Sequence, residues 1–140
     1  MMKKGWFYNP HTGGVKIKPH DQRRIRERIL AHANKHYAGK FIRLDIRFHG
    51  ALVYIDAYQE PGPPSRELLK LRGETREQYY EFMRNQPTYL VRLRHFVRDD
   101  GWSAAFYTYS HERYEPCVFP NGSWTGTLEE GFDIGAIYLA

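Results

Sequence analysis

Arginine and tyrosine recur at alternate positions in four segments of the sequence, which is the spacing of β-strands with one polar face. On paired strands these residues would form one surface of cationic and aromatic side chains, here named the Arg–Tyr face. Proteins that bind single-stranded nucleic acid combine positive charge with aromatic rings on which bases stack. The residues of the predicted Arg–Tyr face are Arg43, Arg47, Tyr54, Arg92, Arg94, Tyr107 and Tyr109.

The Arg–Tyr face has two other interpretations. Cross-strand Arg–Tyr pairs also stabilise a solvated sheet face, by roughly 0.2–1 kcal/mol each, and such a face can be covered by mid-chain helices or a second subunit. The sequence has no fingerprint of a known nucleic-acid-binding module, and a net charge of +5 permits an acidic partner without requiring one. We therefore expect a small non-enzymatic binding or interaction protein, with single-stranded nucleic-acid binding as an alternative.

His32 and His36 have the i, i+4 spacing that lets two imidazoles of one helix share a metal ion. The zinc-protease signature requires Glu directly after the first His, where this sequence has Ala33. A metal-dependent enzyme would need a third ligand from the sheet, with His95 or His111 as candidates. Both helix histidines continue an apolar stripe, so the sequence favours packing over metal binding, and no cofactor is predicted.

Cys117 and His111 have the residue types of a nucleophile and its base. Six residues of extended strand would separate them by about 20 Å, whereas such a pair needs hydrogen-bond reach. Cys117 therefore reads as a small buried apolar residue. No glycine-rich phosphate loop follows any predicted strand, so the common nucleotide-binding folds are not indicated.

Asp45 and Asp56 could act as a carboxylate pair in acid–base chemistry. The expected strand pairing sets Asp56 opposite Arg43 and Asp45 beside Arg47. Because a nearby cation favours the charged form of a carboxyl, this arrangement predicts pKa values below the usual range. The sequence therefore predicts a charge ladder rather than a catalytic pair.

The elements that would position these residues follow from hydrophobic periodicity. Residues 22–37 have the pattern of an amphipathic helix with Asp21 as its N-cap. Strand alternation is found over 41–49, 51–58, 88–97, the segment after Gly101, and 113–119, where Pro116 marks an edge strand. Residues 6–8 and 15–17 would form a short hairpin or an extended N-terminal segment that lies on the rest of the protein.

Two tight loops set the expected register of the sheet. A His49-Gly50 loop would join the first two strands, and Asp100-Gly101 is a strong hairpin signal for the second pair. The first loop leaves one face of its hairpin wholly apolar, which is the condition that specifies register. A three-residue loop in the second hairpin would set Arg94 against Phe106 and mix the faces, so a two-residue loop is expected. The expected pairs on the polar face are Arg43–Asp56, Asp45–Tyr54, Arg94–Tyr107 and Arg92–Tyr109.

Helical patterns complete the predicted fold. Residues 61–87 would form a helical insertion with short helices at 65–71 and 75–85, and a final helix would run over 127–138. The sum is an α+β fold: an antiparallel sheet of four to six strands, an N-terminal helix, the mid-chain insertion, and a C-terminal helix on one face. A length of 140 residues is that of a single domain.

Several blocks of the sequence resemble a family of short bacterial proteins of uncharacterised function, seen often in cyanobacteria. The blocks are GWFYNPHTGG, GKFIRLDIRF, YIDAY, LVRLRHF and FYTYSHERYEPCVFPNGSWTGTLEEGFDIGAIYL. They extend from Gly5 to Leu139, with one departure: the family has Pro-Glu-Glu-Ala-Phe where this chain has LEEGF, from Leu128 to Phe132. The resemblance implies no activity, cofactor or catalytic residue.

Composition adds three expectations. One cysteine excludes a disulfide within the chain. The sequence shows neither a signal peptide nor an apolar run long enough to span a membrane, so we expect a cytoplasmic bacterial protein. A homodimer is compatible with these features, because the proline-marked edge or the aromatic surface could pair across a two-fold axis.

Overall fold

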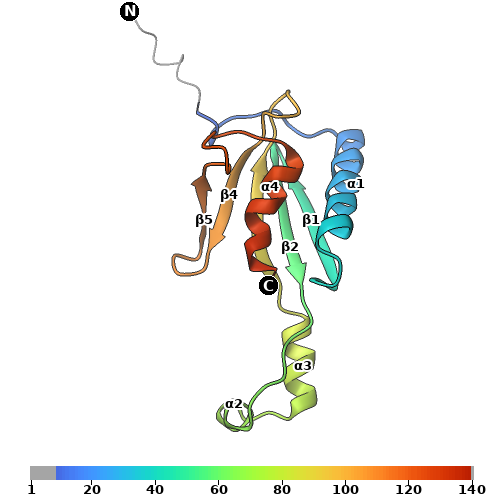
Figure 1. The fold of residues 1–140 in the computed structure, drawn as a ribbon, viewed down its shortest axis with the longest axis vertical. Coiled ribbons are helices and arrows are strands. Elements are labelled where there is room, and N and C mark those ends of the chain that lie inside the picture. Colours follow the sequence, from blue (N-terminus) through green and yellow to red (C-terminus); the bar gives the residue numbers. More distant parts are fainter. Residues whose placement is uncertain (1–8, 140) are drawn as a thin grey trace, which may run out of the picture.

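Five strands form one antiparallel sheet in the computed structural model, which describes residues 9–139 (Figure 1). Strands that are neighbours in the sheet are also neighbours in the chain, so the sheet is a meander. The α+β class and the antiparallel sheet predicted from the sequence are confirmed. The strands are β1 (Arg43–His49), β2 (Leu52–Tyr58), β3 (Thr88–Arg94), β4 (Ser103–Thr108) and β5 (Arg113–Cys117).

Two helices cover one face of the sheet: α1 (Pro19–His36) and α4 (Leu128–Gly135), which continues into a 3₁₀ turn, η2 (Ala136–Tyr138) (Figure 1). Helix α1 begins at Pro19, because proline suits the first turn, where its missing N–H is not needed. Asp21, the expected N-cap, lies in that first turn instead. No helix in residues 9–139 has the length and apolar character needed to cross a bilayer.

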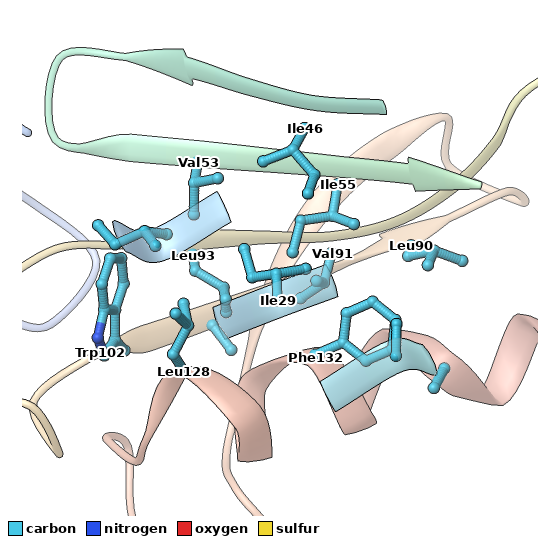
Figure 2. Packing of buried hydrophobic residues seen from close by; sticks show 14 of the residues in the cluster. Ile29, Ile46, Val53, Ile55, Leu90, Val91, Leu93, Trp102, Leu128 and Phe132 are labelled. Carbon is cyan, nitrogen blue, oxygen red and sulfur yellow. The ribbon is translucent and has the colours of Figure 1, made fainter. Parts of the chain in front are cut away.

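The hydrophobic core lies between these two helices and the sheet (Figure 2). Ile29 of α1 and Phe132 of α4 are fully buried against strands β2 and β3. A Cβ on Gly135 would lie 2.7 Å from the backbone carbonyl carbon of Leu90. Glycine weakens the helix locally, but here it lets α4 approach β3 closely.

The β1–β2 hairpin turns one residue later than predicted. Gly50 takes the left-handed backbone conformation of the turn, with a φ of 60°, and glycine adopts it at lower cost than histidine. The pairing is therefore offset by two residues. Because side chains alternate between faces, an even offset leaves each of them on its predicted face. The observed pairs on the polar face are Arg43–Tyr58, Asp45–Asp56 and Arg47–Tyr54.

The β3–β4 pairing is offset by four residues from the predicted register, so the pairs Arg94–Tyr107 and Arg92–Tyr109 are wrong. The β3 ladder ends at Arg94, and the next residue, His95, donates its backbone N–H to the Ala51 carbonyl in the β1–β2 turn. The offset is again even, so Arg92, Arg94 and Tyr107 stay on their predicted face. The observed pairs are Val91–Phe106, Arg92–Ala105, Leu93–Ala104 and Arg94–Ser103.

The segment before α1 runs across the ends of the strands. The Val15 N–H donates to the carbonyl of His95 at 2.8 Å, and the Ile17 N–H donates to the carbonyl of Gly50 at 2.9 Å. The first half of the expected hairpin, residues 6–8, lies outside the described residues. Its second half, residues 15–17, forms no strand and is held by these backbone hydrogen bonds beside the strand ends.

The mid-chain insertion forms two helices, α2 (Arg66–Arg72) and α3 (Arg76–Arg84), that extend from one end of the sheet (Figure 1). Ser65 caps α2, and Thr75 forms the predicted capping box with Gln78 at the start of α3. Neither helix has a buried residue. This helical hairpin, residues 61–87, is called the arm below.

Candidate binding face

The face of the sheet opposite α1 and α4 is covered by no helix of the described chain, and is called the helix-free face. Residues that point to it alternate along each strand with residues of the core. It contains all of the residues predicted for the Arg–Tyr face that lie within strands. Its central side chains are Arg47, Tyr54, Asp56, Arg92, Tyr107 and Tyr114.

Five tyrosines pack ring against ring on this face and form the tyrosine cluster: Tyr54, Tyr89, Tyr107, Tyr109 and Tyr114. The Tyr107 ring lies 5.1 Å from that of Tyr114 and 4.8 Å from those of Tyr89 and Tyr109. Interplanar angles of 59–76° are close to the edge-to-face geometry that aromatic pairs favour. The cluster is therefore a packed surface and not a set of isolated side chains.

Tyr89 and Tyr114 belong to this cluster but were not predicted. Strict alternation through Arg92 places Leu90 on the polar face and Tyr89 in the core. A β-bulge between Ile55 and Asp56 shifts the β2–β3 register, so that Tyr89 lies opposite Asp56 and Leu90 is fully buried. No sequence signal marks this bulge. Tyr114 lies opposite Tyr107 on β5, and alternation applied to that edge strand could have found it.

Two of the predicted arginines lie over the tyrosine cluster. The Arg47 guanidinium lies 5.6 Å from the centre of the Tyr54 ring, and that of Arg92 lies 5.6 Å from the centre of the Tyr114 ring. Both distances are in the range of a cation–π interaction. Arg47 is exposed and Arg92 is partly buried, so both guanidiniums present positive charge at the tyrosine surface.

The other two predicted arginines lie at the margins of the cluster. Arg43 covers the Tyr58 ring at 3.7 Å, four residues along β1 from Arg47. Arg94 donates a hydrogen bond to the carbonyl of Gly13 at 2.8 Å. Burial and the neighbouring positive charge of Arg92 lower the pKa of Arg94. The structure thus places Arg94 beneath the segment before α1.

Asp56 lies at the base of this surface and is only 3% exposed. Its Oδ2 accepts a hydrogen bond from Arg47 at 2.8 Å, whereas its buried Oδ1 has no hydrogen-bond partner among the described residues. Burial raises the pKa of Asp56 to about 6; Arg47 opposes this rise and Asp45 adds to it. The predicted lowering is wrong, because one arginine does not offset burial beside a second carboxylate.

Asp56 also affects its aromatic neighbour. Burial and the negative charge of Asp56 raise the pKa of Tyr114 above its usual value, so this hydroxyl stays protonated. A carboxyl that titrates near pH 6 can exchange a proton under physiological conditions. The helix-free face therefore offers rings, two guanidiniums and one titrating carboxyl.

His11 lies at the end of the face where the segment before α1 crosses it. Its ring contacts that of Trp124 edge-on at 5.3 Å, and its Nε2 is buried without a partner among the described residues. Burial and the charges of Arg92 and Arg94 lower the pKa of His11, so the ring is neutral at pH 7. Sequence analysis missed this residue, because it lies 81 positions before the nearer arginine in the chain.

The helix histidines are held by a different set of contacts. Asp133 of α4 forms hydrogen bonds of 2.7 Å with both His32 Nε2 and the Tyr37 hydroxyl, and burial and this contact raise the pKa of Tyr37 to about 12. The rings of His32 and His36 lie 4.7 Å apart. No group of three potential metal ligands occurs in residues 9–139.

The sheet histidines proposed as third metal ligands have partners of their own. The His95 ring contacts the Val15 carbonyl at 3.0 Å, and His111 contacts Glu115 at 3.0 Å. Cys117 donates a hydrogen bond to the carbonyl of Ala104 at 3.6 Å, and burial raises its thiol pKa. Cys117 and His111 are therefore not brought together as a nucleophile and base.

Comparison of the chain with protein-family models, with curated proteins and with solved structures finds no match. The resemblance to short bacterial proteins stays a prediction. What can be said about function therefore rests on the geometry of the helix-free face.

Proposed function

We propose that this protein is a small binding protein whose working surface is the helix-free face. The observation that supports this most directly is the position of Arg47 and Arg92 over the tyrosine cluster, on a face that no described helix covers. Aromatic rings stack on flat groups, and guanidiniums bind carboxylate or phosphate groups. The ligand would therefore carry both flat rings and negative charge, and the protein would hold it without transforming it.

Single-stranded nucleic acid is the second, more specific candidate. Two rings in contact are flanked by two cations on this face: Arg47 lies over Tyr54, Tyr54 packs against Tyr114 at 5.5 Å, and Arg92 lies over Tyr114. A polymer that carries several bases and several phosphates would match these rings and cations at more than one unit. Double-stranded nucleic acid would fit less well, because its bases are already stacked.

Titration of the protein with a fluorescent single-stranded oligonucleotide, followed by anisotropy, tests the nucleic-acid candidate. We expect binding that weakens steeply as salt rises, because counterions are released from the phosphates. Tyr114→Ala and Arg92→Ala should weaken it. Arg98→Ala is the control, since Arg98 is an exposed loop residue paired with Asp100. No binding at low salt would exclude this candidate.

The broader proposal has its own test. Amide shifts in NMR spectra of isotope-labelled protein would be followed during titration with a nucleoside monophosphate, which carries one ring system and one anion. We expect the shifts to be largest in β2–β5 around Tyr54, Arg92 and Tyr114. Shifts confined to the helix-covered side would contradict the proposed surface, whatever the outcome with oligonucleotides.

A further inference from the structure

The arm lacks an internal hydrophobic core. Its helices have seven and nine residues, and neither contains a buried residue. Isolated helices shorter than about 12–15 residues are marginal in water. Leu71 at the tip is 85% exposed and Phe82 is 48% exposed. Helices this short, with large apolar side chains in solvent, indicate a surface that packs against something else.

Polar contacts stabilise the conformation of the arm but do not provide it with a hydrophobic core. At the base of the arm, Arg84 donates hydrogen bonds of 2.6–3.1 Å to the Glu60 carboxylate. Near the tip, the Arg72 guanidinium lies 5.2 Å from the Phe82 ring. Exposed ion pairs contribute little to stability. These contacts hold the hairpin in one shape and leave the Leu71 side uncovered.

An apolar groove of about 520 Å³ lies elsewhere on the same chain, between α4 and the end of β5. Ile137 and Val118 at its rim are 69% and 45% exposed. Asp133 is the one charged residue in its described lining. The groove is on the helix-covered side of the sheet, separate from the tyrosine cluster. Its apolar lining includes Phe106, Cys117, Val118, Phe119, Ile134 and Ile137.

We propose that the arm of one molecule packs into this groove on a second copy, and that the second arm returns the contact, giving a closed two-fold dimer. Each contact would remove both exposed apolar surfaces from water at once. Figure 1 shows the arm leaving the body along its long axis. Helix α3 alone adds about 13 Å of reach, so the arm is placed to meet a neighbour.

Charge also favours a second copy as the partner. Asp133 of α4 lines the groove, whereas Glu129 of the same helix pairs with Arg28 of α1 at 2.7 Å. Helix α2 of the arm carries Arg66, Lys70 and Arg72 against a single acidic residue, Glu67. An arm that enters the groove therefore brings the basic side chains of α2 to the one carboxylate of the described groove lining, which favours the encounter. A reciprocal exchange makes two identical contacts and leaves none open.

Light scattering coupled to size-exclusion chromatography tests this proposal on the full chain. We expect the wild type to have twice the chain mass of 16.6 kDa. Leu71→Glu on the arm and Ile137→Glu at the groove should each give monomers. Val97→Glu is the matched control, because Val97 is 83% exposed and lies outside both surfaces. Circular dichroism would show that the variants fold, as expected for substitutions at exposed positions.

Mixing the two monomeric variants separates an arm–groove contact from an arm–arm contact. A Leu71→Glu protomer keeps an intact groove, and an Ile137→Glu protomer keeps an intact arm. The mixture should therefore form a heterodimer through one contact, weaker than the wild-type dimer but detectable by native mass spectrometry. A wild type that is monomeric at its highest soluble concentration, a dimer that survives either substitution, or a mixture that stays monomeric would overturn the proposal.

Discussion

On the helix-covered face of the sheet, Val53, Ile55 and Leu93 have no exposed surface and pack among other apolar side chains. The helix-free face is different: its tyrosines and arginines are exposed or partly buried, and they cover a layer of small or polar residues. That layer includes Ser103, Ala105 and Asp56, each at most 3% exposed. Helices cover one face of the sheet, whereas on the other face only the long side chains of the strands cover the residues beneath them.

Under the proposed function, this difference separates the residues that stabilise the sheet from those that bind the ligand. Closing the covered face removes aliphatic surface from water, which is the main favourable term in folding. On the helix-free face, rings and guanidiniums remain in reach of solvent, and a carboxyl is buried at a cost. We therefore expect substitutions on the covered face to change unfolding free energy strongly, and those on the helix-free face to change binding or its pH dependence.

The largest expected effect is that of Phe132→Ala. Phe132 is fully buried between α4, α1 and the sheet, and such truncations cost about 3–5 kcal/mol. Tyr114→Ala, on the opposite face, should cost about half as much, because its ring is only partly buried. Urea denaturation of both variants would measure the two values. Equal costs would mean that the helix-free face is also a core.

Asp56→Asn tests the buried carboxyl. With a pKa of about 6 in the folded state and 3.8 as its ordinary value, Asp56 binds its proton more tightly when folded. Its stabilising contribution is therefore present below pH 4 and is lost as pH rises through 6, by about 2–3 kcal/mol. The variant should lack this loss. Urea denaturation at pH 4 and pH 7 would show this: the unfolding free energy should fall between the two pH values by more in the wild type than in the variant.

The control for Asp56→Asn is Asp45→Asn, across the hairpin. Asp45 is more exposed and contributes to the raised pKa of Asp56 by repulsion. Its removal should reduce the pH dependence without abolishing it. If the wild type and Asp56→Asn lose stability equally between pH 4 and pH 7, then Asp56 does not titrate as the geometry indicates.

Gly135→Ala should destabilise the covered face by about 1–3 kcal/mol, the usual cost of overpacking. The added Cβ would lie 2.7–2.9 Å from backbone and side-chain atoms of Leu90, and the backbone of β3 cannot move away easily. Gly62→Ala is the matched control, because a Cβ there meets nothing within 4 Å. Thermal or urea unfolding would compare the two. A neutral Gly135→Ala would mean that α4 packs less tightly on β3.

The sequence predicts which face of the sheet a side chain occupies, because side chains alternate along a strand with a fixed period. Alternation assigns residues such as Arg47 and Tyr54 to the correct face, and this assignment survives even offsets in register. Which residues pair across two strands depends instead on which turn residue adopts the left-handed backbone conformation and on where the hydrogen-bonded ladder ends. Just beyond β3, the backbone of His95 bonds to Ala51 and Val15, which are distant in the chain, and no local pattern contains such contacts.

The site was predictable in part for the same reason. A bulge after Ile55 brings Tyr89 to the tyrosine cluster, and burial, which no charge pattern reveals, reverses the expected pKa shift of Asp56. The arm helices were predictable because their capping residues are local signals. Their exposure was not, since it depends on where the two connecting segments leave the sheet.

The smallest expected effect on stability, and the sharpest on binding, is at Tyr54. Its ring lies between Arg47 and Tyr114, and a cross-strand aromatic pair contributes only about 0.2–1 kcal/mol to folding. Loss of one stacking ring should cost about 1–3 kcal/mol in binding. Tyr54→Ala should therefore bind a single-stranded oligonucleotide roughly 5–150-fold more weakly, while Tyr54→Phe, which keeps the ring, should bind as the wild type does. If both variants lose affinity equally, the hydroxyl and not the ring contacts the ligand, and the face works by hydrogen bonding rather than by stacking.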